Sequence, residues 1–66
     1  MIAYQVETPD GRVVAEAEGY ENAAFAAVTV ANEDNYLRLD VITGGLLTAM
    51  VVGGRLVEWG HARKER

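Results

Sequence analysis

Two Gly-Gly pairs, at residues 44–45 and 53–54, divide the C-terminal half of the chain into short apolar segments. Consecutive glycines supply the positive φ angles that two-residue β-hairpin loops require. The pairs therefore predict three antiparallel strands, over residues 36–43, 46–52 and 55 to about 61. A phosphate-binding loop would join a strand to a helix, so we interpret both pairs as hairpin turns.

The N-terminal half begins with a predicted hairpin. Residues 2–7 and 12–18 alternate between apolar and polar side chains, as half-buried strands do. The sequence Thr-Pro-Asp-Gly at residues 8–11 between them is typical of a tight turn. We expect Glu7 to lie opposite Arg12. The alternative is a bulge at Gly11, which shifts the register by one residue and turns carboxylates toward the buried face.

Residues 21–33 are rich in alanine and predict a helix. Its apolar stripe is expected at Phe25, Val28 and Asn32, with Ala24 and Ala31 beside them. The predicted fold class is α+β, a small antiparallel sheet with one helix in the order β-β-α-β-β-β. We expect one domain over residues 1–61, followed by a short charged tail over 62–66.

Two-residue loops fix the register of the C-terminal strands and so predict which side chains share a face. The face expected under the helix holds Leu37, Leu39, Val41, Met50, Val52, Val57 and Trp59, with Thr48. The opposite face is expected to hold Ile42, Leu47, Val51 and Leu56, with Tyr36 beside them. We interpret these five residues as an interface, since one short helix cannot cover both faces. The alternative is that the first hairpin folds over this second face and makes it ordinary core.

Missing residue types exclude most catalytic chemistry. The chain has no cysteine and no serine, which excludes disulfides, thiol chemistry and serine or cysteine nucleophiles. The one histidine, His61, is too little for a zinc site, and Lys64 lies in the charged tail. We therefore expect no enzyme activity, no metal, no cofactor and no small-molecule substrate. The N-terminus resembles no signal peptide and no apolar run could span a membrane, so we expect a cytoplasmic protein without membrane contact.

Length and charge indicate the kind of partner. A core built from 66 residues without disulfides or metals rarely supplies more than about 3–5 kcal/mol, and self-association is a common remedy. Residues 1–35 carry seven acidic side chains and one arginine, whereas residues 36–66 carry a small excess of basic ones. We expect a non-catalytic interaction protein that forms a homodimer, binds a host protein, or does both. Its size and acidity suggest an accessory or inhibitory protein of a phage or mobile element.

A second hypothesis starts from the first half of the chain. The Asp10-Gly11 hairpin, the Gly19-Tyr20 pair and the alanine-rich helix resemble the start of HicB-type antitoxins over about half of the chain. The proline- and glycine-rich segment typical of that family between strand and helix is absent. The alternative function is a nucleic-acid-associated regulator, an antitoxin-like protein or an acidic mimic of nucleic acid, and it rests on the uneven charge of the two halves of the chain. Direct nucleic-acid binding is not expected, because the tail holds few cations and no aromatic residues alternate with them.

Overall fold

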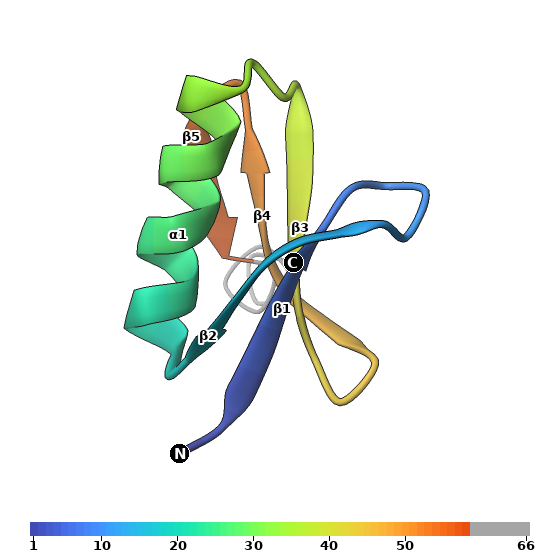
Figure 1. The fold of residues 1–66 in the computed structure, drawn as a ribbon, viewed down its shortest axis with the longest axis vertical. Helices are drawn as coiled ribbons and strands as arrows, with labels where there is room; N and C mark the ends of the chain where they lie inside the picture. Colours follow the sequence, from blue (N-terminus) through green and yellow to red (C-terminus); the bar gives the residue numbers. More distant parts are fainter. Residues whose placement is uncertain (59–66) are drawn as a thin grey trace, which may run out of the picture.

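A single helix lies across one face of a five-stranded antiparallel sheet in the computed structural model, which describes residues 1–58 (Figure 1). The elements are β1 (Ala3–Glu7), β2 (Val13–Glu18), α1 (Tyr20–Glu33), β3 (Arg38–Thr43), β4 (Leu46–Val52) and β5 (Arg55–Glu58). The strand order is β2-β1-β3-β4-β5, so α1 carries the chain from the edge strand β2 back to the far side of β1. The predicted fold class and element order are confirmed. Predictions for residues 59–66, including Trp59, His61 and the tail, lie outside the described residues.

The Gly-Gly turns are confirmed as hairpin loops. Gly53 and Gly54 have φ angles of 60° and 81°, and the residue 44–45 pair is also in the positive region. The second turn is held against the rest of the fold, because the Gly53 amide donates to the Leu37 carbonyl at 3.1 Å. Asn32, in the last turn of α1, lies against Gly54. The loop between β4 and β5 therefore sits at the C-terminal end of the helix.

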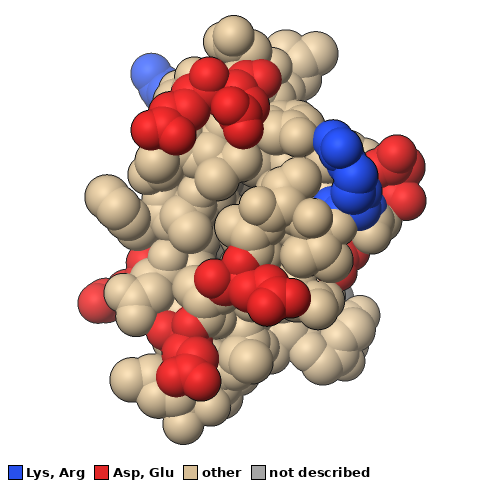
Figure 2. Space-filling view, in the orientation of Figure 1, with Lys and Arg blue, Asp and Glu red and all other residues tan. Residues whose placement is uncertain are grey.

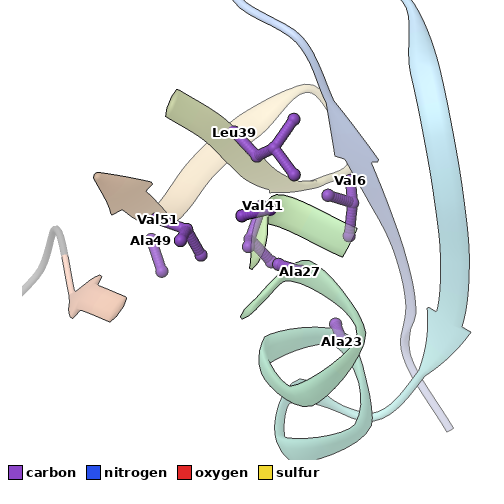
Figure 3. Close-up of a cluster of buried hydrophobic side chains, with 8 residues drawn as sticks. Val6, Ala23, Ala27, Leu39, Val41, Ala49 and Val51 are labelled. Carbon is purple, nitrogen blue, oxygen red and sulfur yellow. The ribbon is translucent and has the colours of Figure 1, made fainter. Parts of the chain in front are cut away.

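The helix contacts the sheet through alanines. Ala23, Ala27 and Ala31 recur every fourth residue and so lie on one face of α1, and none is more than 2% exposed. Figure 3 shows Ala23 and Ala27 directed toward the sheet. The predicted stripe is wrong at Phe25, which is 75% exposed, and at Asn32, which is also exposed, whereas its members Val28 and Ala31 pack on the core as expected. Alanines occupy this face because the sheet already supplies the large side chains, and small ones let the helix lie close to them.

Those large side chains come from the three central strands. Val6 on β1, Leu39 and Val41 on β3, and Val51 on β4 are the largest fully buried side chains. Together with Ala49 they converge on the helix (Figure 3). The core is therefore a single layer between α1 and one face of the sheet.

A β-bulge in β4 decides which residues form that layer. Val41 pairs with Ala49 and Ile42 pairs with Leu47, so Thr48 is an extra residue on β4. Its hydroxyl donates to the Val41 carbonyl at 2.8 Å, which satisfies an acceptor at the interruption. One extra residue reverses the side-chain alternation of everything after it.

The predicted faces of the C-terminal strands are therefore partly wrong. Val51, expected on the face away from the helix, is fully buried beneath it. Met50, Val52 and Val57, expected in the core, lie on the opposite face. Leu39 is placed as expected, under the helix.

The first hairpin combines two register shifts. The Thr8 amide donates to the Arg12 carbonyl at 2.8 Å, which closes a loop of three residues and places Glu7 opposite Val13. The expected pairing of Glu7 with Arg12 is wrong. A second irregularity between Val6 and Glu7 shifts the register by one more residue. Two shifts restore the alternation, so the small residues Ala15 and Ala17 pack on the core cluster while the carboxylates of β2 point away from it.

Candidate functional site

The sheet face opposite α1 is covered by no element of residues 1–58, and we call it the open face (Figure 1). Its centre is apolar. Met50 pairs with Val57 on one side and with Asp40 on the other, and Leu47 pairs with Ile42. The apolar cluster, as we name it, consists of Ile42, Leu47, Met50, Val52 and Val57. Val52 is 46% exposed and Val57 39% exposed, and the other three are half-buried.

The structure divides the five predicted interface residues. Ile42 and Leu47 lie together on the open face, as expected. Val51 is fully buried under α1, and Leu56, its partner on β5, belongs to the same side of the sheet and is 36% exposed. Tyr36 follows the helix, packs against the core cluster and accepts a hydrogen bond of 3.0 Å from the Arg12 guanidinium. The predicted set is therefore not one surface.

Met50, Val52 and Val57 are the residues of the open face that sequence reasoning assigned to the core. The signal that could have found them is Thr48, a polar residue inside an otherwise apolar strand. A threonine whose hydroxyl bonds to backbone marks the interruption of the ladder. Reading the faces separately before and after Thr48 gives the observed assignment.

Charged side chains surround the apolar cluster on the open face. Arg38 forms an ion pair of 2.9 Å with Asp40, whose carboxylate is almost buried on the central strand. Arg55 projects from the edge strand β5, beside Val52. Glu16 and Glu18 project from the other edge strand, β2, opposite Gln5 and Ala3. The open face therefore combines an apolar centre with charges of both signs at its rim.

A shallow hollow of about 490 Å³ lies at one end of the sheet, between the β1–β2 turn and the segment after α1. It is lined by Thr8, Pro9, Asp10, Arg12 and residues 35–38. The Thr8 hydroxyl donates to the Asp10 carboxylate. That hydrogen bond is the main reason why the pKa of Asp10 lies below its usual value. The contact stabilises the turn, because it ties the buried Thr8 side chain to a residue two positions further along the chain.

Tyr20 has the most perturbed acid–base behaviour among residues 1–58. Its hydroxyl donates to Glu58 at 3.1 Å, and its ring packs edge-to-face on Tyr4 with centroids 5.9 Å apart. Burial first, and then the hydrogen bond and charge of Glu58, raise the pKa of Tyr20 to about 12. The pair connects the start of α1 to the edge strand β5. The hydrogen bond to Glu58 keeps the phenol of Tyr20 protonated, so the role of this contact is structural.

Within residues 1–58 no group of three or more His, Cys, Asp or Glu side chains is arranged to hold a metal ion. In the same part of the chain, no helix has the length and apolar character needed to cross a membrane. The open face, with its apolar cluster and charged rim, is the candidate site that the fold positions most clearly.

No protein-family model matches the sequence, so the resemblance to HicB-type antitoxins has no such support. No curated protein and no solved structure matches it either.

Proposed function

We propose that the chain is a small non-catalytic interaction protein that self-associates through the open face of its sheet. The observation that carries this proposal is the apolar cluster on a sheet face that no element of residues 1–58 covers. Apolar side chains gathered on one exposed face mark interaction sites more often than scattered ones do. The fold explains the need: its core is one layer, built from valines, one leucine and alanines. A second layer over the open face would complete a sandwich.

The dimensions of the open face suit a weak dimer. Five strands spaced by about 4.8 Å span about 24 Å, and strands of five residues run for about 17 Å. The flat area is therefore on the order of 400 Å² per copy, and side-chain relief adds to it. Two copies bury on the order of 1,000 Å², at the lower end of specific interfaces. We expect a dissociation constant in the micromolar range.

Sedimentation equilibrium of the full chain tests the proposal. The wild type is expected to form a dimer as its concentration rises through the micromolar range. Met50→Asp places a charge at the centre of the apolar cluster, where an interface would bury it without a partner, so this variant should remain a monomer. Leu47→Asp is a second variant with the same expectation. A wild type that stays monomeric at several hundred micromolar would contradict the proposal.

A matched control uses Leu37, which is 85% exposed and lies in the segment before β3, outside the apolar cluster. Leu37→Asp introduces the same charge on an exposed aliphatic residue and should leave the dimer unchanged. Far-ultraviolet circular dichroism establishes that each variant keeps its fold. Equal weakening by Leu37→Asp and Met50→Asp would mean that net charge, and not the open face, controls association.

Charge supports a second candidate function, binding to a basic host protein as an acidic mimic of nucleic acid. Residues 1–58 hold nine carboxylates and three arginines. Figure 2 shows acidic side chains in separate groups that are divided by uncharged surface, one of them beside basic side chains at the β1–β2 turn. A mimic should not bind DNA itself, whereas direct phosphate contact would give an affinity that falls steeply with salt. A DNA titration at two salt concentrations separates these cases, and binding with a steep salt dependence would rule out the mimic.

A further inference from the structure

Opposite charges occupy diagonally opposed corners of the open face. Glu16 and Glu18 lie on β2, one edge of the sheet, and Arg55 lies on β5, the other edge. The strand register places them at opposite ends as well. Arg55 belongs to the row of cross-strand pairs that also contains Val52 and Arg38, whereas Glu18 pairs with Ala3 at the start of β1.

The separation of the two corners follows from that register. Between the Arg55 row and the Glu18 row lie the rows of Asp40 and of Ile42, so the corners differ by three steps of two residues, or about 20 Å. Four strand spacings across the sheet add about 19 Å in the perpendicular direction. The apolar cluster lies between the two corners.

Neither corner is neutralised within residues 1–58. Arg38 forms its ion pair with Asp40, but Glu16, Glu18 and Arg55 form none with a described residue. All three of these side chains are exposed. The side chains at each corner can therefore form an ion pair with a residue of opposite charge on a partner.

We infer that a second copy of this chain is that partner, in one defined orientation; this inference rests on the self-association proposed above. A two-fold axis that lies in the interface, perpendicular to the diagonal, exchanges the two corners. Glu18 of each copy then faces Arg55 of the other, and the contact occurs twice. Ile42 and Leu47 of the two copies meet beside the axis, whereas Met50 and Val57 lie over β1 of the other copy. The strands of the two sheets cross at a steep angle, as in orthogonal sheet packing.

The other simple two-fold arrangements do not bring the two charged corners together. An axis perpendicular to the strands lays β2 over β2 and β5 over β5, so Glu18 of one copy does not reach Arg55 of the other. An axis parallel to the strands lays the start of β5 over the β1–β2 turn, where Arg55 meets both Arg12 and Asp10 and gains no single partner of opposite sign. Complementary charges across an interface fix its orientation, so the diagonal axis, which alone pairs Glu18 with Arg55, is the one that the charges favour.

A charge-exchange experiment on the full chain tests the orientation. Glu18→Arg alone places arginine against Arg55 at both symmetric contacts, and Arg55→Glu alone places glutamate against Glu18 twice. Each variant alone should dimerise several-fold to about tenfold more weakly than the wild type. When the two variants are mixed, both contacts again pair opposite charges, so the mixed dimer should exceed its statistical share of one half. Native mass spectrometry of an equimolar mixture, with one variant isotope-labelled, measures that share.

The control is Glu21→Arg, the same charge reversal at an exposed position on α1, away from the open face. Mixed with Arg55→Glu, it should give no excess of the mixed dimer. Statistical mixing of Glu18→Arg with Arg55→Glu, while the wild type still dimerises, would overturn the orientation and leave self-association intact. A monomeric wild type would overturn the proposed function itself.

Discussion

Val51 and Val52 are adjacent in β4 and chemically identical, and side-chain alternation places them on opposite faces of the sheet. The bulge at Thr48 decides that Val51 is the one beneath the helix. Val51 is fully buried beneath α1, whereas Val52 is 46% exposed on the open face. Replacing each in turn by alanine measures the two environments with the same change of side chain. We expect Val51→Ala to destabilise the fold considerably more than Val52→Ala.

The size of the difference follows from burial. Val51→Ala removes two buried methyl-sized groups, which costs about 1.6 kcal/mol of transfer free energy, and the cavity adds a further ~0.5–1 kcal/mol. Val52 is about half exposed, so its truncation loses about 0.8 kcal/mol and opens no cavity. The lower β-propensity of alanine affects both variants and cancels. The expected difference in the free energy of unfolding is therefore about 1.5 kcal/mol.

Urea denaturation followed by circular dichroism measures this difference. Because a domain of this size holds only about 3–5 kcal/mol, Val51→Ala should lose about half of its stability. Its melting temperature should fall by about 6 °C or more relative to Val52→Ala. The measurements should be made at low micromolar protein concentration or below, so that self-association does not increase the contribution of Val52 to the free energy of unfolding. Equal stabilities, or a less stable Val52→Ala, would refute the bulged register.

Other parts of the fold give three further expectations. An alanine Cβ at Gly54 would meet Asn32 Oδ1 at 2.7 Å, whereas at Gly45, which has a similar φ angle, it would meet nothing within 4 Å. Thermal melting should therefore show that Gly54→Ala is less stable than Gly45→Ala. If the same order of stability persists after the Asn32 side chain is removed, contact with Asn32 is not the cause. Burial and a neighbouring carboxylate raise the pKa of Tyr20 from 10 to about 12, so above pH 10 the unfolded chain releases a proton that the native state keeps, and stability falls toward pH 12. Urea midpoints at pH 9.5 and 11 should fall more for the wild type than for Tyr20→Phe, and equal slopes would argue against the shift. Ala27→Leu should cost about 1–3 kcal/mol in urea denaturation, because the fully buried Ala27 has no room for three more carbons; an unchanged stability would mean that the helix moves freely away from the sheet.

The type and order of the helix and strands can be predicted from the sequence because its strongest signals are local. The two Gly-Gly turns, the alanine-rich helix and the Thr8–Gly11 turn each specify a short segment, and together they determine the order of the elements. The strand partners of β1 were less accessible. Its pairing with β3 joins residues that are more than thirty positions apart, such as Val6 and Val41. No local pattern encodes such a contact.

The candidate site was predicted in part, and the reason is a single residue. Ile42 and Leu47 lie before the bulge and were placed on the correct face; Met50 and Val57 lie after it and were not. Side-chain alternation is a strong rule within a strand, but one extra residue inverts it. Phe25 shows a different limit. Hydrophobicity alone favours burying it, but the space beneath the helix is already filled by the valine and leucine side chains of the sheet.

The position of β1 has a consequence for the order in which the domain can assemble. This strand bonds to β2, which follows it directly, and to β3, which comes only after the whole helix. During synthesis the hairpin and helix emerge before β3, so Val6 does not yet have Val41, its cross-strand partner, beside it. A stable nucleus therefore requires residues from both sides of the helix, and cutting the chain between α1 and β3 should yield two fragments that become ordered only when they are combined.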